Sequence, residues 1–429
     1  MSNKLYQKAI EQVRGEMVPA LGVTEPAAIA LSTAKAYEVV GGEVKKVAVL
    51  MDEGVFKNGF SCAIPGTSEK GNEMAAALGV IAGKPNLGLR VLEDVTEDDV
   101  SKAKEMIKEG KIEINVKRGA SDIFIDAIVE TDKGTGRAVI KDKHTNIVLI
   151  EKDGKEIFKK DAESETSKGK AFDISKLMLK DLIDIAEHTP YEDINFILEA
   201  VRVNDELAKE GKQGQGMKVG RGISDLIEEG WLKEDILTYA MAYTGYAVDA
   251  RMGGVSKPAM SICGSGDHGL VATLPLIAIA DKKEIPEEKL VRSILLSYLV
   301  TMYIKTFAGR LSAFCGCAIA AGTGSSAGIC YLLGGNNEQI GFTINNMAAD
   351  ITGIICDGGN FGCSMKAVTA ASTAILSALL ALKNIHIPKD SGIVGNTVEE
   401  TMQNIGKIAS PGMIKTNDVI LDIMINRRD

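Results

Sequence analysis

Apolar and polar residues follow two different periods along the chain. Helical spacing of apolar positions predicts four helices in the first third, over residues 4–18, 25–39, 68–81 and 97–109. Alternating or β-branched runs predict strands over residues 45–51, 112–116, 123–131, 137–140 and 146–150. Short glycine-containing pieces separate the later strands, as antiparallel hairpins require. These patterns predict a small antiparallel sheet with one wet face and a cover of helices.

The pattern changes near residue 160. Of the 20 residues 151–170, 12 are charged, which predicts a solvated linker. Beyond it strand signals nearly vanish, and helical periodicity predicts helices over residues 173–188, 191–209, 233–246 and 287–307. A chain of 429 residues also exceeds the size at which one hydrophobic core usually suffices. We therefore predict an α+β protein with an α/β domain over residues 1–165 and a mainly α-helical domain over residues 166–429.

Residues 310–382 carry few charges. Such a stretch predicts the buried helical centre of the protein, where a charge without a partner is costly. Its charged residues are therefore candidates for function: Arg310, Glu338, Asp350, Asp357 and Lys366. The runs 290–307 and 365–382 approach the length of a membrane span, but lysine or arginine interrupts both, so we expect helices buried within protein.

Composition narrows the classes of function. Apolar residues make up 45% and charged residues 25% of the chain, as in ordinary globular proteins, and the net charge of −9 argues against a non-specific nucleic-acid binder. The first ten residues lack the apolar run of a signal peptide, so we expect a cytoplasmic protein with reduced cysteines and no membrane partner. Clustered cysteines in that compartment indicate metal binding or catalysis more often than disulfides.

Six of the seven cysteines lie between positions 263 and 363. Cys356 and Cys363 bracket the glycine-rich run C-D-G-G-N-F-G-C, and Cys315 and Cys317 precede it. Thiolates are soft ligands, and glycine lets backbone approach a bulky inorganic group. Cys363 precedes the predicted helix 365–382, whose N-terminus would stabilise a thiolate. An iron–sulfur cluster is thus indicated, against the alternatives of core packing or a zinc site, for which the six-residue gap is wide.

Several polar stretches are candidates for binding a small zwitterion. They are the run G-V-T-E-P at 22–26, which is also typical of a helix cap at Thr24, and the glycine- or turn-rich pieces at 57–59, 143–146, 249–254 and 263–269. Cations and backbone amides would bind a carboxylate, and polar acceptors would bind an ammonium group. The candidate substrate-binding residues are Thr24, Asn58, His144, Asn146, Arg251, Ser265 and Arg310.

Taken together, the motifs resemble a known family. P-A-L-G-V-T-E-P, K-N-G, H-T-N-I-V, D-A-R-M-G-G, P-A-M-S, G-S-G, R-L-S-A-F-C, I-C-D-G and C-S-M-K occur in this order over nearly the whole chain. The set resembles the L-cysteine desulfidase family, within the iron–sulfur-dependent serine dehydratase α-chain group. The resemblance implies a [4Fe–4S] cluster held by Cys315, Cys356 and Cys363 with one iron open to substrate; Cys317 is the alternative to Cys315.

The chain departs from that family at one position. The family usually has a cysteine, thought to move a proton, where this chain has Val23. The candidates for the general base are then Lys305, Lys366, His268 and Glu25, and spacing does not choose among them.

The implied reaction is non-redox β-elimination of L-cysteine to pyruvate, ammonia and hydrogen sulfide. Elimination from L-serine or a related amino acid, and a cluster-binding protein without catalysis, are the alternatives. The helical faces are compatible with a homodimer, although no heptad seam specifies one.

Overall fold

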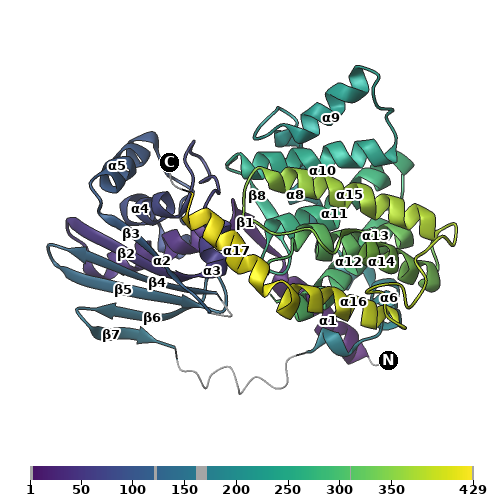
Figure 1. Cartoon of the computed structure of the whole chain (residues 1–429), viewed down its shortest axis with the longest axis horizontal. Coiled ribbons are helices and arrows are strands. Elements are labelled where there is room, and N and C mark those ends of the chain that lie inside the picture. The colour runs from purple at the N-terminus through teal and green to yellow at the C-terminus, as the bar shows by residue number, and fades with distance from the viewer. Residues whose placement is uncertain (1–2, 120–122, 161–171, 310, 428–429) are drawn as a thin grey trace.

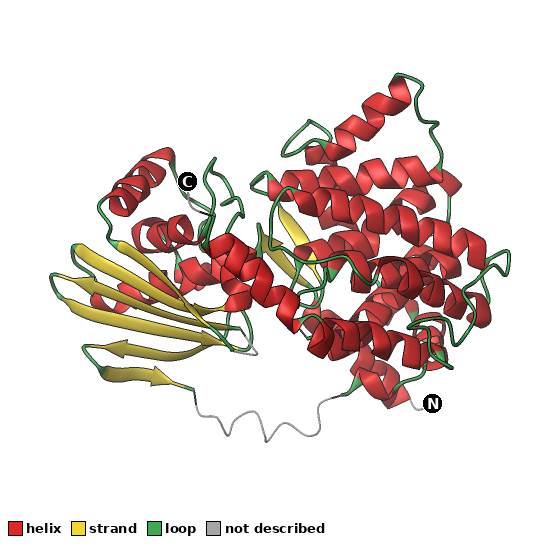
Figure 2. Ribbon diagram, viewed as in Figure 1, coloured by secondary structure: helices red, strands yellow, loops and turns green. Residues whose placement is uncertain are grey.

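The computed structural model describes residues 3–119, 123–160, 172–309 and 311–427. It confirms an α+β protein, with a sheet and its helices at one side and a helical part at the other (Figures 1 and 2). The sheet is formed by β2 (Val44–Asp52), β3 (Ile112–Lys117), β4 (Phe124–Thr131), β5 (Gly134–Lys141), β6 (Ile147–Lys152) and β7 (Lys155–Lys159). With it lie α2 (Thr24–Val40), α3 (Glu53–Gly59), α4 (Asn72–Ala82), the 3-10 helix η1 (Pro85–Arg90) and α5 (Glu97–Lys108).

The sheet has the order β3-β2-β4-β5-β6-β7. All neighbouring pairs are antiparallel except β2 and β3, which are parallel, so the prediction of a purely antiparallel sheet is wrong at this edge. The reason is the connection between the two strands. It runs through α3, α4, η1 and α5, and a crossover of that length returns the chain to the same end of the sheet.

The helical part contains most of the remaining elements. They are α1 (Asn3–Glu16), η3 (Ile174–Lys176), α6 (Leu179–His188), α7 (Tyr191–Ile194), α8 (Ile197–Gly211), α9 (Val219–Glu228), α10 (Ile236–Met252), α11 (Gly266–Lys283), α12 (Glu287–Ala308), the π-helical turn η4 (Cys317–Ala321), α13 (Gly322–Leu332), α14 (Asn337–Ile351), α15 (Gly362–Ala381), α16 (Val398–Lys407), the π-helical turn η5 (Ile408–Gly412) and α17 (Ile414–Ile425). Two short strands, β1 (Val18–Leu21) and β8 (Pro258–Ser261), pair antiparallel.

Local sequence explains several boundaries that differ from the prediction. The first helix ends at Glu16 rather than at residue 18, because Pro19 favours an extended residue before it. The helix predicted from residue 68 begins at Asn72, after Gly71 with φ +96°. Part of the predicted charged linker forms β7, whose residues are all exposed, and residues 161–170 of that linker lie outside the described part of the chain.

Two hydrophobic cores hold the molecule. One lies between the sheet and its helices and includes Ile29, Val47 and Ile125. The other fills the helical part and also includes Ala9 and Val13 of α1, so the first helix packs with elements far along the chain. At the opposite end, α17 crosses back toward the sheet (Figure 1). The boundary between residues 165 and 166 stays a prediction.

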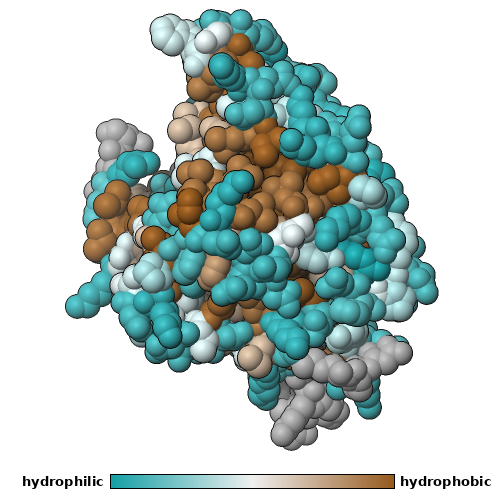
Figure 3. Space-filling model, turned by 90° about the vertical axis from the view of Figure 1, so that its right-hand side faces the viewer, coloured by the Kyte–Doolittle hydropathy of each residue, from teal (hydrophilic) through white to brown (hydrophobic). Residues whose placement is uncertain are grey.

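In the described part of the chain, two helices are long and apolar enough to span a membrane, by length and composition alone. In the most apolar part of α12, 83% of the residues are buried, as predicted, whereas in α15 the figure is 56%. Apolar residues are also exposed elsewhere, and Figure 3 shows a connected apolar area bordered by polar side chains on one face.

Candidate active site

The strand pair β1–β8 brings the N-terminal segment to the helical part. Val18 pairs with Ser261, and the Ser261 hydroxyl donates to the Val18 carbonyl at 2.6 Å. Directly after these strands come Val23 and Thr24 on one side and a turn through Gly264 on the other. The Thr24 hydroxyl donates to the Gly264 carbonyl at 3.3 Å. Residues some 240 positions apart thus meet at the N-termini of two helices, α2 and α11.

Two segments carrying cysteines lie side by side. Phe314 and Ile355 form an antiparallel bridge, the Cys315 amide donates to the Ile354 carbonyl at 2.8 Å, and the Cys356 amide donates to the Ala313 carbonyl at 2.7 Å. This short ladder brings Cys315 and Cys356 together despite the 40 residues between them in the sequence. Cys363 follows in the first turn of α15.

The glycines of the cysteine loop allow it to pack against α3. Gly358 has φ +87°, and a Cβ there would lie 2.2 Å from the Lys57 carbonyl oxygen. A Cβ on Gly359 would lie 2.2 Å from the sulfur of Cys62. Any side chain at either position would force the loop away from α3, so these glycines are needed for close packing against that helix, and their approach to an inorganic group stays a prediction.

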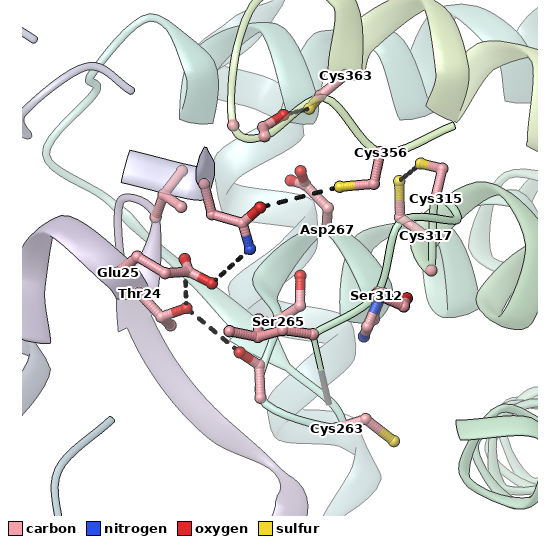
Figure 4. A pocket seen from close by; sticks show the side chains of 18 of the residues that line it. Thr24, Glu25, Cys263, Ser265, Asp267, Ser312, Cys315, Cys317, Cys356 and Cys363 are labelled. Carbon is pink, nitrogen blue, oxygen red and sulfur yellow. Dashed lines mark hydrogen bonds between the residues drawn. The ribbon is translucent and has the colours of Figure 1, made fainter. Parts of the chain in front are cut away.

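The thiols of Cys315, Cys317, Cys356 and Cys363 all line one cavity of about 80 Å³ (Figure 4). Cys315 and Cys317 are in direct contact, with their sulfurs 3.4 Å apart. The hydrogen bond from Cys317 lowers the pKa of Cys315 and raises that of Cys317. Burial raises the pKa of Cys363 well above its usual value and also raises that of Cys356, so the thiolate expected from the helix N-terminus is disfavoured by desolvation.

A buried carboxylate network lies across the cavity. The Glu25 carboxylate accepts from the Asn58 amide at 2.9 Å and from the Thr24 hydroxyl at 3.1 Å, and Nε2 of His144 lies 3.5 Å from it. Burial acts to raise the pKa of Glu25, but His144 and Asn58 outweigh it and bring that pKa to about 2. Glu25 is therefore ionised. Helix α2 begins with Thr24, and its N-cap residue is Val23, so the interpretation of Thr24 as a helix cap is wrong.

A buried ion pair lies beside this network. Arg251 donates to Asp267 at 2.7 Å and to the Gly22 carbonyl at 2.7 Å, while its Nε has no hydrogen-bond partner among the residues that the structure describes. The guanidinium packs closely against Gly266, the first residue of α11. A Cβ at that position would lie 2.7 Å from Nε of Arg251. The expected glycine loop at 249–254 is thus mostly the last turn of α10, which holds Arg251 rigidly.

His268 lies in the first turn of α11 and lines the cavity. Burial, and to a smaller extent the ammonium of Lys305, lower the pKa of His268 to about 3, so its imidazole is neutral. Nδ1 lies 3.3 Å from the Ile262 carbonyl, and a protonated Nδ1 there would leave the lone pair on Nε2, which faces Gly316. Lys305 also lines the cavity, from the last turn of α12.

Not every predicted residue reaches this cavity. Lys366 is absent from its lining and forms an ion pair with Asp357 that, against the effect of burial, raises the pKa of Lys366. Asn146 lines another cavity, on the sheet. Arg310 lies outside the described residues. Glu338 and Asp350 are exposed. The structure therefore gathers most of the named residues at one place: Thr24, Glu25, Asn58, His144, Arg251, Ser265, His268, Lys305, Cys315, Cys356 and Cys363.

Asp267, Ser312 and Phe314 also line this cavity, although they were not predicted from the sequence. Asp267 belongs to the run C-G-S-G-D-H-G, and an acidic residue beside a histidine at a helix N-terminus was a usable signal. Ser312 and Phe314 belong to R-L-S-A-F-C. They contact the cavity only because the ladder turns that run toward it, which no local pattern predicts.

The donor set suits some metal groups better than others. Within the described ranges, no three or more His, Cys, Asp or Glu side chains are grouped so that they could hold a metal ion. A [4Fe–4S] cluster makes a different demand, because each cysteine binds a different iron and the sulfurs must surround the cluster. The thiols of Cys315, Cys356 and Cys363 line one cavity and are soft donors suited to iron and sulfide, and their role as cluster ligands stays a prediction.

Known proteins resemble the chain over nearly its whole length. The profile of the serine dehydratase alpha chain family matches residues 86–422. A UPF0597 protein of Clostridium botulinum strain Langeland is 51% identical over 422 residues, which cover 97% of this chain and 98% of the relative. A UPF0597 protein of Clostridium tetani is 45% identical over 97% of this chain and 98% of the relative, and one of Caldanaerobacter subterraneus is 40% identical over 97% of both. The chain therefore belongs to the serine dehydratase alpha chain family, as a member of its UPF0597 proteins.

Proposed function

We propose that the protein is a lyase that eliminates sulfide from L-cysteine, giving pyruvate, ammonia and hydrogen sulfide. The observation that carries the proposal is that cysteine thiols, an ionised glutamate and a buried arginine line one cavity. A [4Fe–4S] cluster on Cys315, Cys356 and Cys363 would supply an open iron, a Lewis acid for the leaving sulfur. The remaining chemistry belongs to side chains of this chain.

The zwitterionic part of the substrate fits the opposite wall. The amides at the start of α11 and the Ser265 hydroxyl offer donors to a carboxylate, and Arg251 beside them adds positive charge. The ionised Glu25 offers an acceptor for the substrate ammonium group. With both ends bound, the β-carbon substituent points toward the thiol side, which is the orientation that elimination needs.

His268 is the proposed acceptor of the α-proton. Its imidazole is neutral, and Nε2, the nitrogen that would carry the lone pair, lies against Gly316, which also lines the cavity. Val23 lines the same cavity and cannot carry a proton, so the role has to fall on another side chain. Lys305, which lies close enough to lower the pKa of His268, would stabilise the developing negative charge on the substrate.

The test is an assay of anaerobically reconstituted protein. Iron and sulfide content, and release of hydrogen sulfide and pyruvate from L-cysteine, are measured together. Turnover of L-cysteine supports the proposal. A protein that holds iron and sulfide but turns over no amino acid would refute the lyase, and a protein that binds zinc but never sulfide would refute the cluster as well.

L-serine is the second candidate substrate. The family description favours it, and the same side chains would serve, because only the leaving atom changes. Competition of the two amino acids for one preparation decides between them through the ratio of their kcat/KM values.

A further inference from the structure

The side chain of Lys57 is almost completely buried, with 2% of its surface exposed. Its ammonium donates to the Ser312 carbonyl at 3.2 Å and to Oδ1 of Asn417 at 2.7 Å. No ion pair of Lys57 with a carboxylate occurs within the described ranges of the chain. A buried charge with only neutral acceptors is costly, so a role beyond simple packing is expected.

Lys57 contacts both segments that carry the thiols. Ser312, whose carbonyl accepts from Nζ, lies three residues before Cys315. The backbone of Lys57 meets the glycine loop at Gly358, two residues after Cys356. One residue of α3 thus touches the two segments at the point where they form their ladder.

The C-terminal helix α17 holds Lys57 from the other side. Asn417 accepts from Lys57 through Oδ1, and its Nδ2 donates to Glu53 at 3.4 Å. Further along, Asp422 of α17 pairs with Arg118 at 2.6 Å. A cavity of about 340 Å³ lies where these elements meet. It is lined by residues that include Lys57, Ser312 and Asn417.

The packing of α17 is light. Of its apolar residues, Ile420, Leu421 and Met424 are buried, while Ile414, Val419, Ile423 and Ile425 are largely exposed. A helix with few buried contacts detaches at lower free energy than the core does. Polar contacts such as that of Asn417 therefore carry a larger share of its docking.

We propose that Lys57 is a positioning residue of the thiol pocket, and that α17 holds it in place through Asn417. Docking of the C-terminal helix then fixes residues 312–315, and with them the sulfur of Cys315, against the loop of Cys356. The inference deepens the proposed function, on which it rests for the role of the two thiols as cluster ligands.

The test measures alkylation by iodoacetamide of single cysteines in protein without cluster, mapped by mass spectrometry. Asn417→Ala should accelerate modification of Cys315 and Cys356 by about tenfold, which is the effect of losing a hydrogen bond to a charged group. Asn417→Asp keeps the acceptor oxygen for Lys57 but loses the donor to Glu53, so it should restore the slow rate in part. Lys415→Ala, an exposed position on the same helix, is the matched control and should change nothing.

Lys57→Met keeps the aliphatic stem and removes the ammonium, so it should act like Asn417→Ala. Cys330, buried in the helical core, is the internal reference in every sample. Unchanged rates at Cys315 and Cys356 in both variants would overturn the proposal. Equal acceleration at Cys330 or in Lys415→Ala would also overturn it, because the effect would then be general loosening. Since the labelling needs neither cluster nor turnover, a failed lyase assay would leave this result standing.

Discussion

Replacing Glu25 by glutamine tests the charge at the centre of the substrate wall. Glutamine has nearly the same shape but only one acceptor oxygen, so it can accept from Asn58 or from Thr24 and loses the negative charge beside His144. The pKa of Glu25 is about 2, against 4.5 for an ordinary glutamate. That difference corresponds to about 3 kcal/mol of folding free energy at neutral pH.

The sign of the pH dependence follows from the lowered pKa. The stabilisation is fully present above the unfolded pKa of 4.5, and it is lost as the pH falls from there toward about 2. Urea unfolding of the native chain and of Glu25→Gln should therefore differ by about 3 kcal/mol at pH 7 and converge toward pH 2.

The matched control is Glu206→Gln, which breaks an exposed pair with Arg202 on one helix turn and should cost less than about 1 kcal/mol. The stabilising role of the Glu25 charge is refuted if Glu25→Gln lowers the free energy of unfolding by no more than Glu206→Gln does. It is refuted equally if the difference between native chain and variant does not shrink with acidification.

Three further predictions concern the same cavity. Cys356→Ser should abolish the brown absorbance of reconstituted protein, whereas Cys330→Ser should keep it; retained colour in Cys356→Ser would show a wrong ligand assignment. Asp267→Asn leaves the buried guanidinium of Arg251 without its counter-charge and should lower the free energy of unfolding by about 3 kcal/mol or more; a loss below about 1 kcal/mol would contradict the buried pair. His268→Gln should lower kcat by about a hundredfold or more with little change in KM, and should slow exchange of the substrate α-hydrogen with deuterated solvent equally; unchanged exchange would assign the base elsewhere.

The fold class followed from residue periodicity because both periods are clear in this chain. The helices α2, α5 and α12 begin within one residue of their predicted starts. The parallel pairing of β3 could not be predicted, because that strand alternates polar and apolar residues as antiparallel strands with one wet face do. The strands β1 and β8 are four residues each, too short for a period, and they exist because each pairs with the other across the fold.

The candidate site could be predicted where its residue types form an unusual pattern in the sequence. Cysteines and glycines in an uncharged stretch are such a signal, and the structure brings the predicted cysteines to one cavity. Lysines are common, and only tertiary structure separates Lys305, which lines the cavity, from Lys366, which is paired with Asp357 outside it. In the sequence, Lys57 was notable only as part of the motif K-N-G. Its burial could not be predicted, because it depends on contact with Asn417, 360 residues later.

Residues from early and late parts of the chain together line the cavity, so neither part can form it alone. The segments after β1 and in α3 supply Glu25 and Asn58, while the thiols come from segments more than 250 residues later. Neither hydrophobic core contains a complete set of donors, so a fragment with one core would lack either the thiol wall or the carboxylate wall. Val23 lies at this junction, where a Cβ on Gly359 would come within 3.2 Å of its side chain. The apolar side chain of Val23 therefore packs between the thiol wall and the carboxylate wall of the cavity. Proton transfer has to come from the polar side chains around it.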